Sequence, residues 1–145
     1  MDKFNKLALT AVDLQRQRKF DEAKKIYKEL LIVQGKNPQI LRLIGAIEYE
    51  LKNYSKSLEY LNKSIEINPN ESETFSNRGM VNVKLNNIKQ ATADYQKALN
   101  INNKNPNPFF NLGHLFKEQG DLDKSIDYFN KCLIIDNKNY KAFHN

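Results

Sequence analysis

The chain has 145 residues, of which 40% are hydrophobic and 28% charged, a balance typical of one folded globular domain. No apolar run approaches the roughly 20 residues of a membrane-spanning helix, and the opening MDKFNKLAL lacks the apolar core of a secretory signal. One cysteine, Cys132, excludes an internal disulfide framework and favours a reducing compartment. We therefore expect a cytoplasmic protein without membrane contact.

The formal net charge of +6 is spread along the chain. Residues 1–37 hold nine Lys and Arg against five Asp and Glu, and the remaining residues hold fourteen against twelve. No block of five consecutive Lys or Arg residues occurs. The surplus therefore indicates a solvated surface, and we expect no nucleic-acid partner.

The chain repeats itself every 34 residues. A shift by this period aligns glycine with glycine and large apolar residues with one another, without a gap. The aligned columns are Gly45, Gly79 and Gly113, with Ala11 one period earlier; Ala23, Ser57, Ala91 and Ser125; Tyr27, Leu61, Tyr95 and Phe129; and Leu7, Leu41, Phe75, Phe109 and Phe143. In chain order the units are 4–37, 38–71, 72–105 and 106–139, and a partial fifth unit covers 140–145.

Each unit is predicted to be a pair of helices, because apolar residues recur at helical spacing on both sides of a short polar stretch. The predicted turns are Arg18-Lys19, Lys52-Asn53, Asn86-Asn87 and Gly120-Asp121, and the units are expected to end near Gly35, Pro69, Asn103 and Asn137. Pro38 and Pro106 are expected to open the next helix, and Asp121 or Asp123 to cap the last one. The glycine and small-residue columns predict a close helix crossing in each unit.

This pattern resembles the tetratricopeptide repeat (TPR) family, since the stretches NLGHLFKEQGDLDKSIDYFNKCLIID and SNRGMVNVKLNNIKQATADYQKALNI are close to a consensus unit of that family. The resemblance implies an all-α fold, a right-handed superhelical solenoid of antiparallel helix pairs that forms a single array over 1–145. Glu48 and Asn82 depart from it, because their column is usually aromatic. Arg78 replaces an aliphatic residue, and we expect its stem to pack while its head reaches water.

The first helix of each unit keeps one stripe free of the packing columns. In the TPR family such stripes line up into a concave groove that holds extended peptides, so the resemblance implies a protein or peptide partner. The candidate groove residues are Arg42, Leu43, Ala46, Tyr49, Asn77, Met80, Lys84, Asn111, His114 and Asn145.

Asn77, Asn111 and Asn145 fall in one column of this stripe. A side-chain amide both donates and accepts hydrogen bonds, so amides at the repeat spacing could hold a peptide main chain of any sequence. The column resembles the asparagine ladder of TPR proteins that bind peptides in this way. The alternative is that asparagine is merely frequent here, since the chain contains twenty.

Two other features compete with the amide column. Arg42 and Asn77 match two positions of the carboxylate clamp with which some TPR proteins hold a peptide C-terminus. The remaining clamp positions lack the required cations, so a dicarboxylate would be poorly compensated; they hold Ala46, Asn107 and Asn111. An apolar patch could take a peptide side chain or be covered by a neighbouring segment; it comprises Leu9, Val12, Leu43, Ala46 and Tyr49.

No motif for catalysis or for a cofactor stands outside the repeat pattern, so we expect neither an enzyme nor a bound cofactor. His114, His144 and Glu118 could in principle bind zinc. A solvated or peptide-contacting histidine pair is the better interpretation, and we expect no metal. Cys132 lies in a small-residue column and is expected to be a buried, inert thiol.

The favoured hypothesis is a non-catalytic scaffold for protein–protein interaction. Two alternatives stay open. The array could be the N-terminal substrate-recognition arm of a larger enzyme, such as a glycosyltransferase or sulfotransferase, because YKAFHN opens a further unit instead of a polar cap. It could also form a homo-oligomer through exposed terminal repeats.

Overall fold

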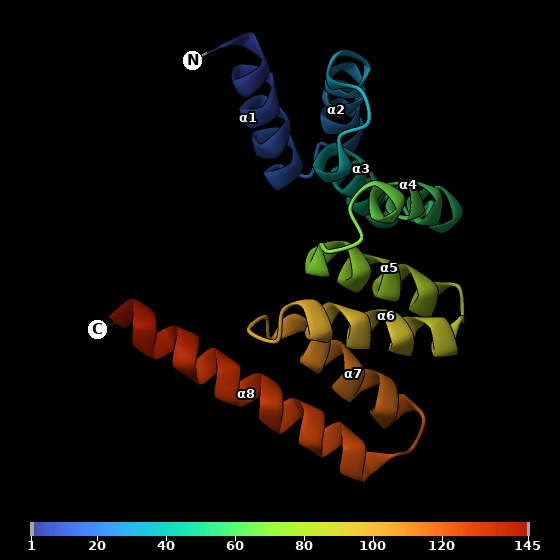
Figure 1. Ribbon diagram of the computed structural model, residues 1–145, viewed down its shortest axis with the longest axis vertical. Helices are drawn as coiled ribbons and strands as arrows, with labels where there is room; N and C mark the ends of the chain where they lie inside the picture. Colours follow the sequence, from blue (N-terminus) through green and yellow to red (C-terminus); the bar gives the residue numbers. More distant parts are fainter. Residues whose placement is uncertain (1, 145) are drawn as a thin grey trace. The chain divides into compact units, whose positions relative to one another are not determined.

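The computed structural model describes residues 2–144, and side-chain surroundings through residue 138. Within this range the chain is helical and contains no strand (Figure 1). The helices are α1 (Lys3–Arg16), α2 (Phe20–Gln34), α3 (Pro38–Glu50), α4 (Tyr54–Ile67), α5 (Ser72–Lys84), α6 (Ile88–Ile101), α7 (Asn107–Glu118) and α8 (Leu122–His144). Among the helices of this described part, none combines the length and the apolarity that a membrane crossing requires.

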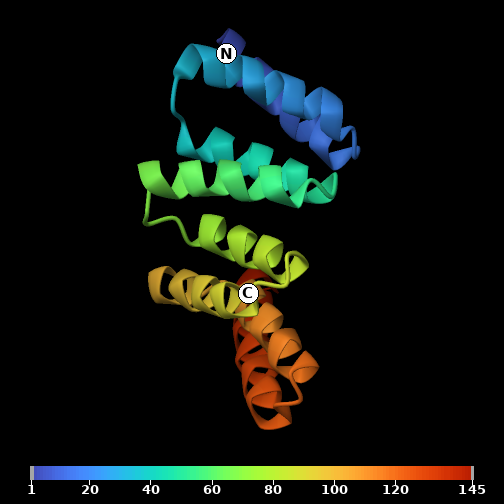
Figure 2. The same cartoon turned by 90° about the vertical axis from the view of Figure 1, so that its right-hand side faces the viewer.

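The helices group into two compact units, each of which contains two of the repeats. Unit 1 is Met1–Pro69 with α1–α4, and unit 2 is Asn70–Asn145 with α5–α8. Inside each unit, consecutive helices run antiparallel and pack side by side (Figure 2). The core of unit 1 gathers around Tyr27 and Ile44, and that of unit 2 around Tyr95. The predicted all-α fold of stacked helix pairs is confirmed in both units.

The turn within each repeat begins with a residue in the left-handed conformation. These residues, with their φ angles, are Arg18 (60°), Lys52 (62°), Asn86 (61°) and Gly120 (83°). The following backbone N–H bonds back to the first helix, as Asp121 N does to Phe116 O at 2.9 Å. All four predicted turns are confirmed, although glycine alone adopts this conformation without strain.

The glycine column marks the closest approach of the two helices of a repeat. A Cβ at Gly79 would lie 2.6 Å from the Tyr95 ring, and a Cβ at Gly113 would lie 2.7 Å from the Phe129 ring. Such distances lie inside van der Waals contact, so a larger residue would force the ring to move. In the first repeat Ala11 takes this position and is fully buried.

The small-residue column supplies hydrogen bonds as well as space. Ser57 Oγ donates to the carbonyl of Gly45 at 2.6 Å, and Ser125 Oγ donates to the carbonyl of Gly113 at 2.8 Å. Each bond ties the second helix of a repeat to the first helix at their crossing. The two alanines of the column are fully buried, so the predicted close crossing is confirmed.

Helix starts follow the predicted capping. Asp121 Oδ1 accepts from the backbone N–H of Lys124 at 3.2 Å, and this backbone hydrogen bond lowers the pKa of Asp121. Pro38 is the first residue of α3, and Pro106 directly precedes α7. The two prolines occupy the same repeat position, and each stands at the start of the first helix of its repeat.

The last helix differs from the prediction. The sequence predicts a helix end near Asn137, but α8 continues through this residue without a break. The earlier repeat boundaries contain Gly35, Pro69 and Pro106, whereas α8 contains neither glycine nor proline, so nothing interrupts its hydrogen-bond ladder. The expected turn at Asn137 is therefore wrong. The predicted partial fifth repeat, 140–145, falls on residues whose side chains are outside the described part.

Candidate functional site

The two described amides of the predicted ladder lie on neighbouring helices. Asn77 is on α5 and Asn111 is on α7, and these two helices contact each other. Both side chains are partly buried, and neither amide forms a hydrogen bond with another described group. Asn145 lies outside the described residues, so the third member of the column stays a prediction.

Three further candidate groove residues lie on the same two helices of unit 2. Met80 on α5 is partly buried and packs against the core of the unit. Lys84 on α5 and His114 on α7 are exposed. The stripe of unit 2 therefore presents two amides, one cation and one imidazole on two contacting helices.

The candidate groove residues of unit 1 all come from α3 and are partly buried; they are Arg42, Leu43, Ala46 and Tyr49. Leu43 packs against the core of unit 1, and the ring of Tyr49 lies 5.7 Å from that of Tyr54. Burial raises the pKa of Tyr49. These contacts favour the covered interpretation of the apolar patch at α3, whereas Leu9 on α1 is 54% exposed.

His114 packs against two phenylalanine rings. Its ring centroid lies 4.6 Å from that of Phe110 and 5.2 Å from that of Phe129, both in edge-on geometry. Phe110 is 48% exposed, so this aromatic cluster reaches the surface. The sequence pattern did not indicate Phe110, because its column holds no aromatic residue in the other repeats.

The thiol is engaged in packing as well. Cys132 is buried, and burial raises the pKa of its thiol, with the carboxylate of Asp136 at 3.8 Å from Sγ adding to the effect. A thiol with a raised pKa is a poor nucleophile at neutral pH. Across the residues whose side chains are described, no three His, Cys, Asp or Glu side chains gather as metal ligands would.

A buried carboxylate in unit 2 is the strongest candidate for a charged site. Asp94 accepts hydrogen bonds from Arg78 Nε at 3.1 Å and Nη2 at 2.7 Å. It also accepts from Asn82 at 2.9 Å and Gln90 at 3.1 Å, so donors occupy both oxygens and the network is structural. The prediction that Arg78 extends its head into water is wrong, because its side chain is 18% exposed and pairs bidentately with Asp94.

Unit 1 holds a second buried carboxylate. Glu48 on α3 lies 3.1 Å from Lys24 Nζ on α2 and accepts from Asn53 at 2.8 Å. Burial alone would raise the pKa of Glu48, but the hydrogen bonds and the charge of Lys24 together lower it below the ordinary value. The carboxylate therefore stays ionised and ties α3 to α2.

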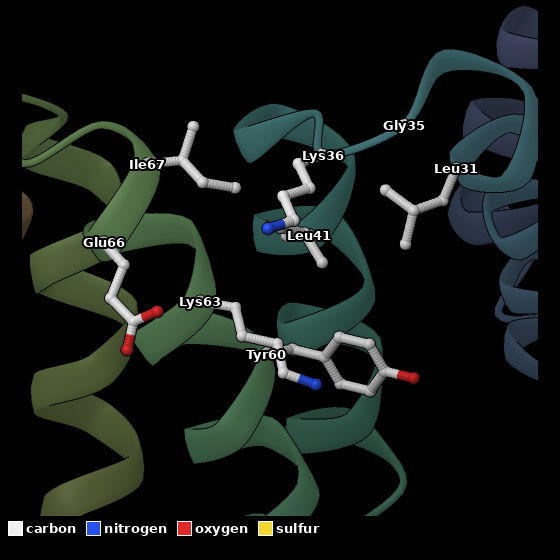
Figure 3. A pocket seen from close by; sticks show the side chains of 8 residues that line it. All are labelled: Leu31, Gly35, Lys36, Leu41, Tyr60, Lys63, Glu66 and Ile67. Carbon is white, nitrogen blue, oxygen red and sulfur yellow. The ribbon is translucent and has the colours of Figure 1, made fainter.

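A pocket of about 600 Å³ lies between the end of α2, the start of α3 and the second half of α4 (Figure 3). The α2–α4 pocket is lined by Leu31, Gly35, Lys36, Leu41, Tyr60, Lys63, Glu66 and Ile67. None of these residues belongs to the predicted groove. The signal that could have found the pocket is Leu41, a leucine in the column that holds Phe75 and Phe109 in the later repeats.

Family models match most of the sequence. Two models described as tetratricopeptide repeat match residues 9–72 and 107–139, and one described as TPR repeat matches residues 81–120. No curated protein matches the chain.

Solved structures share the fold. A tetratricopeptide repeat protein from Parabacteroides merdae is 28% identical with a TM-score of 0.76, and the match covers 90% of this chain and 51% of that one. MamA from Desulfovibrio magneticus RS-1 is 15% identical with a TM-score of 0.80, covering 94% of this chain and 77% of that one. The first TPR of Spaghetti (RPAP3), solved with the HSP90 peptide SRMEEVD, is 20% identical with a TM-score of 0.75, covering 81% of this chain and 94% of that one.

The repeat period, the glycine crossings and the family models agree along the chain. The second helices of the four repeats begin 34 residues apart, at Phe20, Tyr54, Ile88 and Leu122. The models together reach from residue 9 to residue 139 with one short gap. The chain belongs to the tetratricopeptide repeat family.

Proposed function

We propose that this chain is a non-catalytic protein-interaction module that binds an extended segment of a partner protein along the first helices of its repeats. The observation that carries the proposal is the amide pair Asn77 and Asn111, partly buried on contacting helices and without a hydrogen bond to another described group. A partly desolvated amide gains more from a ligand hydrogen bond than a fully hydrated one does.

A peptide main chain is the ligand that such a pair fits best. Each residue of a peptide presents one N–H and one C=O, and an asparagine amide can accept from the first and donate to the second. Two amides on rigid helices, one repeat apart, would set the direction and register of an extended segment. Met80 and Lys84 lie beside them and would contact its side chains.

The comparisons support a peptide as the ligand class. The first TPR of Spaghetti is solved with the HSP90 peptide SRMEEVD. A clamp for a terminal carboxylate is less favoured in this chain, because Ala46, Asn107 and Asn111 stand where the family's clamp needs Asn, Lys and Arg. Recognition of the main chain needs no such cations.

The test compares two double variants with the wild-type chain. A peptide selected by display against the wild type serves as the probe, and fluorescence anisotropy gives its Kd. Asn77→Ala with Asn111→Ala is expected to weaken binding by at least about tenfold, because the lost hydrogen bonds are worth about 1 kcal/mol each. The control, Asn100→Ala with Asn130→Ala, removes two exposed amides from α6 and α8 and is expected to leave the Kd unchanged.

The melting temperature of each variant separates a binding defect from a folding defect. If the Asn77 and Asn111 variant melts like the wild type and binds with the same Kd as the control, main-chain recognition by these amides is wrong. A peptide that instead needs its free C-terminus for binding would favour the carboxylate clamp.

A second candidate function is self-association through α8. Leu122, Ile126 and Leu133 share one side of this helix and are 60%, 59% and 64% exposed. In the third repeat the equivalent Leu99 packs against the cluster that includes Leu112 of α7. The apolar stripe of α8 is therefore the kind of surface that another helix covers, and a second copy of the chain would supply one.

Sedimentation equilibrium tests this second candidate. The wild type is expected to show a mass that rises with concentration, and Leu133→Glu is expected to stay monomeric because the charge would be buried in the contact. A mass of 16.9 kDa at every concentration would rule self-association out.

A further inference from the structure

The α2–α4 pocket lies wholly within unit 1 and is separate from the predicted groove. Figure 3 shows the amine of Lys36 in front of Leu41, with the ring of Tyr60 below and the carboxylate of Glu66 on the opposite wall. Leu41 is 5% exposed and gives the pocket an apolar floor. Its volume of about 600 Å³ falls within the range of ligand pockets, roughly 300–1,000 Å³.

Two of the residues that line the pocket recur in the fourth repeat, two periods later in the chain. Tyr60 and Lys63 of α4 correspond to Tyr128 and Lys131 of α8. In both repeats the lysine amine lies over the tyrosine ring, at 5.7 Å from the Tyr60 centroid and 5.2 Å from the Tyr128 centroid. The two sites therefore share one local arrangement, and their difference is informative.

The difference lies at one apolar position of the first helix. In unit 2 the ring of Phe109 lies 6.4 Å from that of Tyr128, with 35° between their planes. In unit 1 the same position holds Leu41, which has no ring to set against Tyr60. Leu41 and Tyr60 both line the pocket, so the pocket lies at the repeat positions where unit 2 sets the ring of Phe109 beside that of Tyr128.

We propose that the α2–α4 pocket binds an aromatic side chain of a partner protein, and that this side chain is flanked by an acidic residue. The ring takes the place that Phe109 fills in unit 2 and lies against Tyr60 and Leu41. Aromatic rings prefer such tilted contacts and bury about 150–250 Å² each. An aromatic anchor seated in a preformed pocket carries a large share of the binding energy in many interfaces.

The charges at the rim of the α2–α4 pocket are the reason to expect an acidic residue next to the aromatic residue of the partner. Lys63 is already held by Glu59 at 2.8 Å. Lys36 is exposed, points into the pocket and has no ion-pair partner among the described residues (Figure 3). A carboxylate next to the aromatic residue would pair with Lys36, while Glu66 on the opposite wall disfavours the reversed orientation.

The test uses the full chain labelled with nitrogen-15 and the capped peptide acetyl-Gly-Phe-Asp-Gly-amide. Binding is expected to move the amide signals of Gly35, Lys36 and Leu41 in a saturable way. Replacing the phenylalanine of the peptide with alanine is expected to abolish these shifts. Replacing its aspartate with asparagine is expected to weaken binding on the order of tenfold, the value of one charge-assisted hydrogen bond.

Three protein variants locate the site. Leu41→Phe installs the residue of the fourth repeat and is expected to abolish the shifts by filling the pocket, with no fall in melting temperature. Lys36→Gln is expected to weaken the aspartate peptide on the order of tenfold and to leave the asparagine peptide unchanged. Lys28→Gln removes an exposed charge from α2 that does not line the pocket; it is the control and is expected to leave the affinity for both peptides unchanged.

Several outcomes overturn the proposal. They are equal binding of the phenylalanine and alanine peptides, saturable shifts that persist in a folded Leu41→Phe chain, and no shift at Gly35 and Lys36. If Leu41→Phe does not fold, Lys36→Gln decides, and an unchanged affinity for the aspartate peptide then overturns it. None of these results bears on the amide pair, which lies in the other unit.

Discussion

The third and fourth repeats build the same three core positions from opposite chemistries. The third repeat holds Arg78, Asn82 and Asp94, and the fourth holds Leu112, Phe116 and Tyr128. In the third, the side chains form a hydrogen-bonded network around Asp94. In the fourth, the rings of Phe116 and Tyr128 stack with centroids 5.5 Å apart and planes 5° from parallel. Both repeats nevertheless form a helix pair with the same turn position.

The comparison shows that the three side chains at these positions must suit one another, either by hydrogen bonding or by apolar packing. The residue type at any one position matters less. A buried carboxylate is unfavourable on its own, so Asp94 needs the donors of Arg78 and Asn82 together. An aromatic pair gains from burial and needs no polar partner. The same helix crossing therefore tolerates either set, and we expect it to reject a mixture of the two.

The largest expected effect comes from removing the centre of the polar set. Asp94→Ala leaves Arg78 and Asn82 without their acceptor and is expected to cost about 3 kcal/mol, the lower end for a broken buried pair. The lower end applies because the Arg78 side chain keeps 18% exposure and regains some hydration. Urea unfolding measures the loss. Gln90→Ala removes one exposed donor of the same network and, as control, should cost less than about 1 kcal/mol.

Exchanging the whole set tests the comparison directly. The triple variant Arg78→Leu, Asn82→Phe and Asp94→Tyr gives the third repeat the side chains of the fourth. Well-packed apolar replacements of buried ion pairs are often neutral or stabilising by about 1–4 kcal/mol, so the triple variant is expected to be at least as stable as the wild type. Each of the three substitutions made alone is expected to be destabilising. A triple variant less stable than Asp94→Ala would show that backbone differences between the repeats, and not side-chain satisfaction, decide these positions.

The glycines at the helix crossings of the third and fourth repeats face aromatic rings that differ in burial. Gly79→Ala and Gly113→Ala each place a Cβ within 2.7 Å of a ring, and overpacking of this kind costs about 1–3 kcal/mol. Tyr95, which faces Gly79, is 2% exposed and therefore has less room to shift than Phe129, which faces Gly113 and is only partly buried. Gly79→Ala is therefore expected to lower the melting temperature more than Gly113→Ala. Equal losses would mean that the helices, and not the rings, give way.

The smallest expected effect is a pH dependence in the second repeat, where Glu48 occupies the column of Asn82 and Phe116. The pKa of Glu48 is lowered in the folded state, so its ion pair stabilises the fold above the unfolded pKa, near 4.3. That contribution is lost as the pH falls through the lower folded pKa. Urea unfolding at neutral and acidic pH should show a steeper acid loss for the wild type than for Glu48→Gln. If the free energy of unfolding falls equally with pH in the wild type and in Glu48→Gln, this carboxylate does not contribute to the acid dependence of stability.

Much of the fold could be predicted because it depends on local chemistry that recurs. The column of Gly45, Gly79 and Gly113 indicates the helix crossings from the sequence alone. The turn positions followed from the polar stretches, since each turn needs one left-handed residue at the same place. The prediction was wrong at Asn137, where the pattern of the earlier boundaries was extended to a segment without glycine or proline.

The candidate site was less predictable. The free stripe could be located from helical spacing, but burial of Leu43 and Tyr49 depends on neighbouring helices that spacing does not specify. Asn77 and Asn111 were found as a column, and their role in binding stays a prediction. So does the expectation that all repeats act as one array.

The sequence by itself determined the repeat, the helix pairs and the positions where two helices cross, because each follows from residue size and backbone preference at a fixed period. Only the tertiary structure decided which polar residues meet. Arg78 and Asp94 are sixteen positions apart on different helices, and nothing local indicates that one neutralises the other. The α2–α4 pocket likewise forms where residues of three helices meet around Leu41, at the repeat position that holds Phe109 in the fourth repeat.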